Sequence, residues 1–198
     1  MLKRCFDLAL TIPGLLLLLP VLLLVMVLIW LDDHGPIFFR QERIGYKGKT
    51  FRMWKFRTMV VNAEALGKQI TVGADPRITR IGHFLRKCKL DEFPQLFNII
   101  TGEMSLVGPR PEVPRYVAMY SDTQRHVLDV MPGITDPASI KYRDENDILA
   151  ATDDPEKVYI EQIMPEKIRI NLDYVANASL ATDLVVILNT LQKLFRRK

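Results

Sequence analysis

The sequence predicts a mostly helical α+β protein that is held at a membrane by its N-terminal segment. Three observations lead to this prediction. An uncharged apolar run extends from Leu8 to Leu31, and several later segments carry apolar residues at helical spacing. Between them, two short segments rich in aromatic and β-branched residues flank a glycine-containing loop, which is typical of a β-hairpin. We expect residues 1–34 to form the membrane segment and residues 35–198 to form the other domain.

The composition fits one domain with an excess of apolar residues in one region. The chain has 198 residues, of which 48% are hydrophobic and 25% charged, and a net charge of +4. This length allows one moderate core and not two full domains. The positive charge favours an anionic partner such as lipid headgroups, a phosphorylated substrate or nucleic acid. Cys5 and Cys88 lie far apart without metal-ligand spacing, which indicates a reducing compartment.

The apolar run is long enough to cross a bilayer, since it contains about 24 residues. Its flanking charges argue against crossing. Lys3 and Arg4 precede the run, and a dense series of cations follows it: Arg40, Arg43, Lys47, Lys49, Arg52, Lys55 and Arg57. The positive-inside rule would place both ends in the cytoplasm. Pro20, near the middle, removes a helical hydrogen bond and predicts a kink, so we expect a re-entrant helix that enters and leaves on the same side.

Local patterns predict the remaining elements. Ile37-Phe38-Phe39 and Thr50–Trp54 read as two strands around a loop at residues 45–48. Helices are expected over residues 78–87, over the segment between Glu92 and Gly102, and over 112–130, 166–176 and 182–198, with a surface helix and loop at 60–72. The last helix has an apolar stripe and a basic end, which is the pattern of a helix in the membrane interface. The same stripe could instead pack on the core.

Residues 86–111 bring together side chains suited to chemistry on phosphorus. Three cations, including Arg86, precede the adjacent carboxylates Asp91 and Glu92, and Arg110 lies near the end of the stretch. A carboxylate can attack phosphorus as a nucleophile, a second one can hold a divalent ion or a proton, and an arginine can bind phosphate oxygens through two bonds. The alternative is a structural role, with Asp91 as a helix N-cap and Glu92 as a first-turn charge.

Three segments resemble the signature of a known family: LDEFPQLFN at residues 90–98, GEMSLVGPRP at 102–111 and PGIT at 132–135. They are similar to the bacterial sugar transferases known as monotopic phosphoglycosyl transferases, and the resemblance covers nearly the whole chain. It implies a re-entrant N-terminal helix, a short β-hairpin and interfacial amphipathic helices, with residues 35–198 as a membrane-associated catalytic domain. That domain would lie on the cytoplasmic face of the bacterial inner membrane, in contact with membrane lipids.

The resemblance also implies a reaction. The enzyme would transfer a phospho-sugar from a UDP-sugar to a polyprenol phosphate, undecaprenyl phosphate, and release UMP. This step would initiate synthesis of a surface glycoconjugate through a covalent phospho-sugar intermediate on Asp91. Asp91 and Glu92 would be the catalytic pair and would hold Mg²⁺. The substrate-binding candidates are Lys55, Arg86, Arg110, Arg143 and Asp173, although an exposed helical position is an equally supported reading of Asp173.

Two departures from the family pattern affect structure. Leu19 precedes Pro20 where relatives often carry serine, and Asp136-Pro137 follows PGIT where many relatives have Gly-Trp. The second departure is expected to reshape a loop that faces the nucleotide or the sugar, without affecting the chemistry.

Two other functions remain open on the sequence alone. One is a membrane-anchored phosphohydrolase with water as acceptor, and the other is a non-enzymatic membrane adaptor. Nucleic acid is not an expected partner, because the sequence carries no recognised nucleic-acid motif. Glycine-rich phosphate fingerprints are also missing, so cations and metal would have to hold the phosphates. No motif indicates the sugar, and both a monomer and a homodimer are compatible with the sequence.

Overall fold

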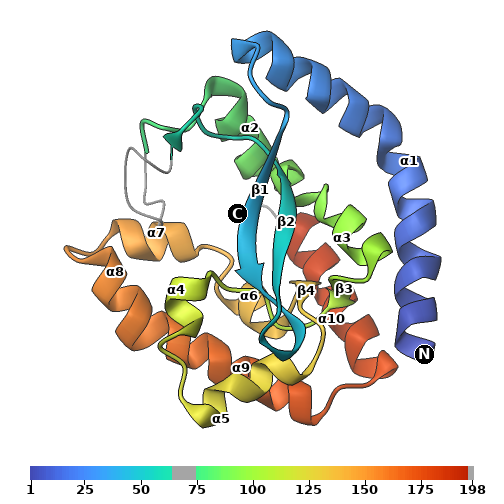
Figure 1. The fold of residues 1–198 in the computed structure, drawn as a ribbon, viewed down its shortest axis with the longest axis vertical. Helices are drawn as coiled ribbons and strands as arrows, with labels where there is room; N and C mark the ends of the chain where they lie inside the picture. The colour runs from blue at the N-terminus through green and yellow to red at the C-terminus, as the bar shows by residue number, and fades with distance from the viewer. Residues whose placement is uncertain (64–74, 196–198) are drawn as a thin grey trace.

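The computed structural model describes residues 1–63 and 75–195 and has the mostly helical α+β architecture expected from the sequence (Figure 1). The helices are α1 (Leu2–Asp33), α2 (Arg80–Cys88), α3 (Gln95–Thr101), α4 (Pro114–Val117), α5 (Asp122–Arg125), α6 (Pro137–Lys141), α7 (Glu145–Ala150), α8 (Pro155–Val158), α9 (Met164–Ala176) and α10 (Leu180–Phe195). Short 3₁₀ turns are η1 (Tyr46–Gly48), η3 (Leu90–Glu92) and η4 (His126–Asp129), and η5 (Tyr159–Ile163) is a π-helical turn. The strands are β1 (Phe38–Ile44), β2 (Thr50–Phe56), β3 (Ser105–Val107) and β4 (Gly133–Thr135). Most of the surface helix and loop expected at 60–72 lies outside the described residues.

Helix α1 continues through both of its prolines. The sequence predicts a kink at Pro20, and the structure has one continuous helix from Leu2 to Asp33 with Pro13 and Pro20 inside it. Figure 1 shows this helix curving along one edge of the molecule. One face of the helix packs inward, where Leu22, Val25 and Ile29 contact Phe56 and Leu85. The helix is long and apolar enough to cross a membrane by length and composition.

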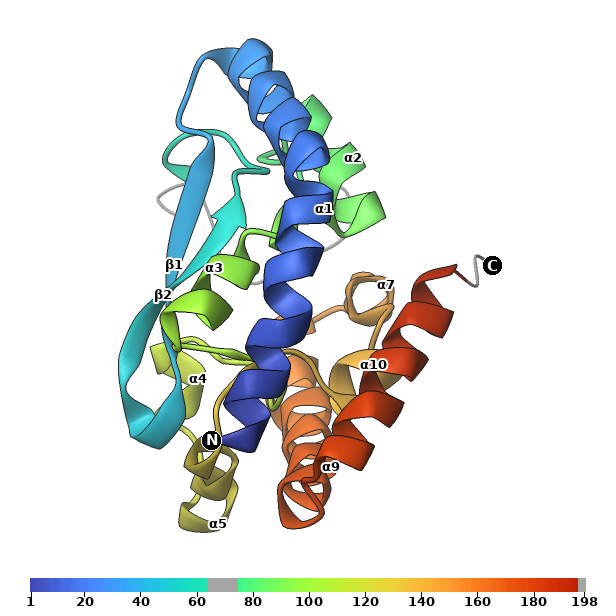
Figure 2. The same ribbon diagram turned by 90° about the vertical axis from the view of Figure 1, so that its right-hand side faces the viewer.

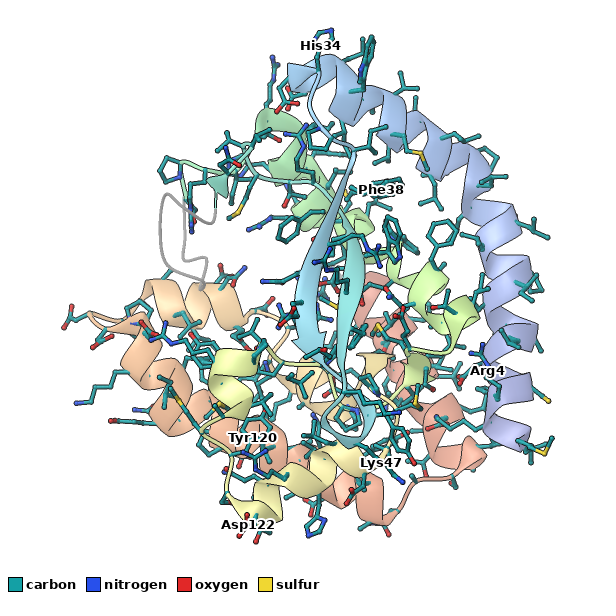
Figure 3. The ribbon with its side chains drawn as sticks, viewed as in Figure 1. Arg4, His34, Phe38, Lys47, Tyr120 and Asp122 are labelled. Carbon is teal, nitrogen blue, oxygen red and sulfur yellow. The ribbon has the colours of Figure 1, made fainter. Side chains whose placement is uncertain are left out.

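Both ends of α1 are bonded to the same domain. Near the N-terminus, Arg4 donates hydrogen bonds to the carbonyl oxygens of Ile99 and Ile100 at the end of α3, the latter at 2.8 Å (Figure 3). The buried Asp7 carboxylate accepts hydrogen bonds of 3.1 Å from the Ser105 hydroxyl and the Leu106 amide of β3. These bonds attach the first two turns of α1 directly to α3 and to β3, the strand inside the second family-like segment.

Ion pairs complete the attachment. Lys3 pairs with Asp183 of α10, which also accepts a 2.6 Å hydrogen bond from the Tyr174 hydroxyl. At the other end of α1, Asp33 pairs with the buried Arg57 that follows β2. Because polar side chains at both ends of the helix are bonded to residues of one domain, the helix lies alongside that domain over its whole length (Figure 2).

The predicted β-hairpin is confirmed. Strands β1 and β2 pair in an antiparallel register that sets Phe38 opposite Phe56 and Ile44 opposite Thr50, so both strands are longer than expected. A second, parallel pair forms between β3 and β4, with Ser105 aligned to Gly133. The sequence did not predict this pair, because parallel pairing joins segments that are distant along the chain.

The parallel pair brings two of the family-like segments into backbone contact. A Cβ atom at Gly108 would lie 2.2 Å from the carbonyl oxygen of Met131, and one at Gly133 would lie 2.1 Å from the amide nitrogen of Gly108. No side chain fits at either position. Glycine therefore allows the close approach that fixes where the following residue pair, Pro109 and Arg110, leaves the sheet.

The single helix expected over residues 112–130 is wrong. The structure has α4, α5 and η4 in its place. Ser121 adopts an extended conformation and caps α5 through a capping box with Gln124. A capping box favours the start of a new helix over continuation of the preceding one. The helix stop expected at Gly102 is confirmed, since this residue adopts φ 84° at the end of α3.

Asp136 and Pro137 start a helix where a reshaped loop was expected. The buried Asp136 carboxylate accepts a 3.0 Å hydrogen bond from the Ser139 amide, and Pro137 occupies the first turn of α6. Aspartate at the N-cap followed by proline is a favourable helix start. The departure from the family pattern thus forms a capped helix beside the cavity described below.

Helix α10 presents most of its apolar stripe to the outside. Leu184, Leu188 and Leu191 are exposed, whereas Val186 is buried. Figure 2 shows α10 and α1 on the same face of the molecule. This exposure favours the interfacial reading of α10 over packing on the core, and the basic end at residues 196–198 lies outside the described residues.

Candidate active site

The turn η3 carries the two carboxylates between α2 and α3. Lys89 ends α2 in a left-handed conformation with φ 57°, and Pro94 begins α3. Neither η3 nor α3 has a side-chain cap, so the reading of Asp91 as a helix N-cap is wrong, whereas Glu92 does lie in the first turn of η3. Asp91 is only 9% exposed, and its carboxylate has no hydrogen bond to any residue that the structure describes.

Glu92 is held by two cations. Its Oε1 atom accepts a 3.2 Å bond from Lys55 Nζ and also forms an ion pair with Arg110. Burial raises the pKa of Glu92, but the charges and hydrogen bonds of Arg110 and Lys55 outweigh burial and hold the pKa well below its usual range. Glu92 is therefore ionised in the interior of the site.

The pKa of Asp91 is shifted in the opposite direction, upward. Burial and the neighbouring charge of Glu92 raise the pKa of the Asp91 carboxyl, against the opposing charges of Lys55, Arg86 and Lys89. The two adjacent carboxyls are thus pushed apart in pKa by their surroundings, a pattern that marks functional carboxylate pairs. Arg86 is oriented by a 2.9 Å hydrogen bond from its Nε atom to the Thr58 hydroxyl.

These residues line a cavity of about 930 Å³, which falls in the size range of small-molecule sites. Six of the seven residues predicted from the sequence contribute to its wall: Lys55, Arg86, Asp91, Glu92, Arg110 and Arg143. One side of the cavity is apolar and comes from α1, α3 and α10, with Leu10, Gly14, Leu96, Ile187 and Leu191. Polar side chains also line the cavity, namely Gln41, Arg43, Glu112, Tyr116, Tyr159, Lys167 and Asn171, and they alternate with apolar ones such as Val113, Leu149, Met164 and Ile168.

The two remaining predicted residues differ in their placement. Arg143 lines the cavity and donates a hydrogen bond to the carbonyl oxygen of Lys193 in α10. Asp173 is exposed on α9, accepts a 3.2 Å bond from Arg169 and does not line the cavity. The structure therefore supports the exposed helical reading of Asp173, and a substrate role for it remains a prediction without geometric support.

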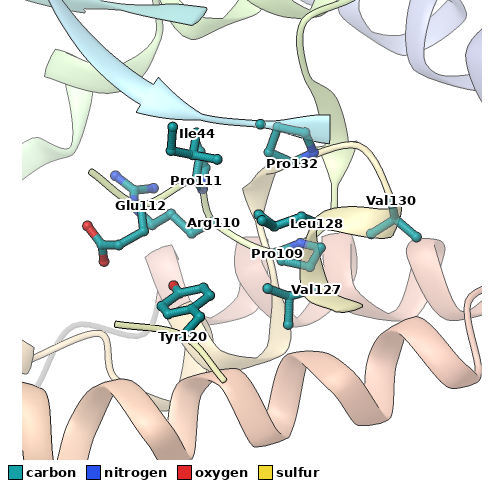
Figure 4. A pocket seen from close by; sticks show the side chains of 11 residues that line it. Ile44, Pro109, Arg110, Pro111, Glu112, Tyr120, Val127, Leu128, Val130 and Pro132 are labelled. Carbon is teal, nitrogen blue, oxygen red and sulfur yellow. The ribbon is translucent and has the colours of Figure 1, made fainter. Parts of the chain in front are cut away.

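A buried network beside Arg110 was missed from the sequence. Arg43 of β1 donates to the carbonyl oxygen of Pro111 at 3.2 Å and to Glu112 Oε1 at 3.0 Å, and the Tyr159 hydroxyl donates to Glu112 Oε2. Figure 4 shows this loop running between Ile44 and Tyr120. The network braces the loop that carries Arg110. Its only sequence signal was the position of Glu112 directly after the proline-rich segment.

The two carboxylates could hold Mg²⁺ only if a substrate supplied further oxygen ligands. Within residues 1–63 and 75–195, no group of three or more histidine, cysteine, aspartate or glutamate side chains is placed to hold a metal. Mg²⁺ often uses one or two carboxylates and takes its remaining ligands from substrate phosphates and water. Asp91 and Glu92 are adjacent, and both cations on Glu92 contact the same oxygen. The carboxylate pair therefore offers the few oxygen ligands that such a site requires.

Comparison with known proteins identifies a matching family and several relatives. The family model described as bacterial sugar transferase matches residues 1–197. The exopolysaccharide production protein ExoY of Sinorhizobium fredii is 37% identical over 96% of this chain and 83% of its own length. The UDP-glucose:undecaprenyl-phosphate glucose-1-phosphate transferase of Escherichia coli is 36% identical over all of this chain, and the undecaprenyl-phosphate galactose phosphotransferase of Salmonella typhimurium is 34% identical over 99% of it. This chain spans 41% of the length of each of these last two proteins.

Proposed function

This chain belongs to the bacterial sugar transferase family, and we propose that it acts as a phosphoglycosyl transferase. It transfers a sugar 1-phosphate from a UDP-sugar to undecaprenyl phosphate, the type of transfer that the name of the Escherichia coli relative describes for that protein, and releases UMP. One observation carries the proposal. Asp91, a buried carboxylate without a hydrogen-bond partner among the described residues, shares a cavity with Lys55, Arg86 and Arg110 and with apolar residues of α1 and α10.

The chemistry proceeds in two displacements at one phosphorus atom. A carboxylate oxygen of Asp91 forms a bond to the β-phosphorus, while the bond from that phosphorus to the bridging oxygen breaks and UMP leaves with that oxygen. An oxygen of the polyprenol phosphate then attacks the same phosphorus and expels the Asp91 carboxylate. Support for Asp91 as the nucleophile comes from its unbonded oxygens and from the nearby charges of Lys55, Arg86 and Lys89, which favour its ionised form.

The cations around the carboxylates suit a diphosphate. Arg110 and Lys55, which pair with Glu92 in this structure, would bind phosphate oxygens and oppose the charge that develops on the leaving phosphate. Glu92 with Asp91 would hold Mg²⁺, which would neutralise the diphosphate. The covalent intermediate, the metal and the roles of individual residues are parts of the proposal.

A lipid acceptor is supported by the apolar side of the cavity. Leu10 and Gly14 of α1 and Ile187 and Leu191 of α10 line it, and the outer surfaces of both helices expose further leucines. We propose that α1 is immersed in one leaflet of the inner membrane and that the domain lies on the cytoplasmic face. An isoprenoid chain would then reach the site from the membrane without leaving an apolar environment.

The test is a reaction of the purified protein with UDP-sugars, undecaprenyl phosphate and Mg²⁺. Formation of a sugar-linked lipid together with UMP is expected. Free sugar phosphate without the lipid product would identify a phosphohydrolase, and absence of turnover with every donor would favour the membrane adaptor. A phospho-sugar adduct on Asp91, found by mass spectrometry when the acceptor is left out, would separate the covalent route from direct transfer.

A further inference from the structure

We propose that Arg143 and Lys193 bind the phosphate of the lipid acceptor at the α10 side of the cavity. Both residues line the same cavity as Asp91, Arg143 from the turn between α6 and α7 and Lys193 from the last turn of α10. We call these two residues the α10 cation pair. This inference rests on the proposed function, because it names the residues that hold the second substrate of that reaction.

Cations outnumber carboxylates on the wall of the cavity. The lining cations are Arg43, Lys55, Arg86, Lys89, Arg110, Arg143, Lys167 and Lys193, and the lining carboxylates are Asp91, Glu92, Glu112 and Glu145. A cavity with such an excess of positive charge favours anionic ligands. The proposed reaction supplies two of them in turn, the diphosphate of the donor and the phosphate of the lipid.

The α10 cation pair is the part of this excess that lies apart from the lining carboxylates. Three of those carboxylates are paired with other lining cations: Glu112 with Arg43 at 3.0 Å, Glu145 with Lys167 at 2.7 Å, and Glu92 with Lys55 and Arg110. The fourth, Asp91, is influenced by the charges of Arg86 and Lys89. No carboxylate within residues 1–63 and 75–195 forms an ion pair with Arg143 or Lys193. Two such cations on a cavity wall offer a site for a phosphate.

The two cations meet at the end of α10. Arg143 donates a hydrogen bond to the carbonyl oxygen of Lys193, which joins the turn before α7 to the last turn of α10 (Figure 2). A guanidinium carries five N–H donors, so this bond leaves donors for a ligand. A purely structural role for Arg143, as a partner for a carbonyl group at the end of a helix, does not require the ammonium group of Lys193. Variants of Lys193 therefore distinguish the two roles.

The neighbours of the α10 cation pair indicate that the phosphate belongs to a lipid. Ile187 and Leu191 of α10 line the cavity and precede Lys193 on the same helix, and Leu184 and Leu188 are exposed on α10. The cavity-lining part of α10 thus changes from apolar to cationic toward its end. A polyprenol phosphate has the same order, an apolar chain that ends in a charged phosphate.

The donor fits this part of the cavity less well. A UDP-sugar is polar throughout, so burial beside Ile187 and Leu191 would not stabilise its complex. Its diphosphate is suited to Lys55 and Arg110, the cations beside the two carboxylates. The acceptor phosphate must approach a second phosphate group, and like charges repel. The α10 cation pair would offset this repulsion without withdrawing Lys55 or Arg110 from the donor.

The test removes each charge separately. Arg143→Gln and Lys193→Gln keep a polar side chain without the charge, and Arg143→Lys keeps the charge. Arg125→Gln and Lys157→Gln are matched controls, because they cause the same change in net charge at exposed positions that do not line the cavity. Binding is measured as the shift in melting temperature caused by undecaprenyl phosphate, undecaprenol or phosphatidylglycerol in neutral detergent micelles. The KM for undecaprenyl phosphate and for the UDP-sugar donor is measured alongside.

We expect Arg143→Gln and Lys193→Gln each to weaken binding of undecaprenyl phosphate by at least roughly fivefold, as for the loss of a hydrogen bond to a charged group. The KM for the acceptor should rise more than the KM for the donor. Arg143→Lys should restore part of the binding, since lysine also binds phosphate as a point charge. Undecaprenol should give a smaller shift than undecaprenyl phosphate in the wild type, and both controls should match the wild type throughout.

Four results would overturn the inference. The first is acceptor binding within about twofold of wild type in Lys193→Gln, which would leave Arg143 with a structural role only. The second is a larger rise in the donor KM than in the acceptor KM, which would assign the pair to the UDP-sugar. The third is an equal loss of phosphatidylglycerol binding in both variants, which would assign the pair to bulk membrane headgroups. The last is a wild type whose melting temperature does not respond to undecaprenyl phosphate.

The proposed function can fail separately from this site. The thermal shift does not require turnover. Phosphate-dependent binding of undecaprenyl phosphate that is lost in Arg143→Gln and Lys193→Gln, together with a wild type that releases no UMP from any UDP-sugar, would contradict the proposed transferase activity. The same result would support a lipid phosphate site at the α10 cation pair.

Discussion

Glu92 and Arg110 form an ion pair inside the cavity, although they lie 18 residues apart and in two different family-like segments. The charge of Glu92 raises the pKa of Arg110, and the charges of Arg110 and Lys55 lower that of Glu92 against the effect of burial. The pair keeps a guanidinium and a carboxylate charged at the site before any substrate arrives. The phosphate contact proposed for Arg110 would therefore require little reorganisation when the substrate binds.

Replacement of Asp91 by asparagine should reduce turnover to background. The amide keeps the size of the side chain but removes the attacking carboxylate oxygen. UMP release from UDP-sugars in the presence of undecaprenyl phosphate measures the effect, and thermal melting checks that the variant is folded. The control is Asp153→Asn, since Asp153 is exposed and does not line the cavity. More than roughly one hundredth of wild-type activity in folded Asp91→Asn would contradict nucleophilic catalysis by this residue.

Replacement of Arg110 by lysine should lower kcat/KM by roughly 100-fold or more. Lysine retains the charge opposite Glu92 but lacks the planar fork that binds two phosphate oxygens at once. Arg169→Lys is the matched control, because Arg169 forms only exposed ion pairs on α9, and such pairs contribute little to stability. Similar activity in both variants would remove Arg110 from the phosphate site.

The activity should fall at low pH with a midpoint above 3.8, the ordinary pKa of an aspartate side chain. Burial and Glu92 raise the pKa of Asp91, and only its ionised form attacks, so activity rises as the pH rises through this elevated pKa. The pH profile of kcat/KM reports the free enzyme. Glu92→Gln removes a negative neighbour, which should move the midpoint of its residual activity to lower pH. Circular dichroism over the same range separates this effect from acid unfolding, and a wild-type midpoint at or below 3.8 would contradict the prediction.

Removal of divalent metal should abolish turnover. Asp91 and Glu92 are two carboxylates surrounded by cations, and they can complete a Mg²⁺ site only with substrate oxygens. Activity is measured after treatment with excess chelator and again after addition of Mg²⁺, which should restore it. Zinc-free buffers and a calcium control distinguish Mg²⁺ from other ions. Full activity in excess chelator would exclude a metal from the reaction.

Both ends of α1 should face the cytoplasm. The helix contains 32 residues, or roughly 48 Å at 1.5 Å per residue, which exceeds the roughly 30 Å apolar core of a bilayer. Yet Lys3 at one end and Asp33 at the other are bonded to the same domain. A helix that crossed the membrane would have to break one of these attachments and would carry its flanking cations to the outer face.

Cysteine labelling tests this topology. Leu2→Cys and His34→Cys are made separately in a protein whose two exposed cysteines, Cys5 and Cys88, have been replaced. A membrane-impermeant maleimide should label neither position in intact cells and both after the inner membrane is opened. Asp153→Cys, in the catalytic domain, is the control for a cytoplasmic position. Labelling of the Leu2 position alone in intact cells would identify an ordinary spanning helix.

The sequence by itself determined the elements whose signals are local. Several signals each involve neighbours along the chain: the aromatic and β-branched segments and glycine-containing loop of the β-hairpin, the Gly102 stop, and the apolar spacing of α2, α9 and α10. The carboxylate pair at Asp91 and its cations were also recognisable, because they occur within one short stretch that resembles a known family.

The same local approach failed where two local signals competed. Residues 112–130 have apolar residues at helical spacing, but Ser121 and Gln124 form a capping box that starts α5 separately. Asp136 and Pro137 were expected to reshape a loop, but they form the N-cap and the first turn of α6. In each case, the outcome depends on the balance of small free energies that the sequence pattern does not reveal.

Tertiary structure alone decided which distant side chains share the cavity. The pairing of β3 with β4, the approach of Gly108 to Gly133 and the bond between Arg43 and Glu112 join segments separated by many residues. The tertiary structure also leaves Asp173 exposed, whereas Asn171, two positions earlier, is buried and lines the cavity. Neighbouring positions on a helix point in different directions, and only the packing of α9 against the rest of the domain determines which of them reaches the site.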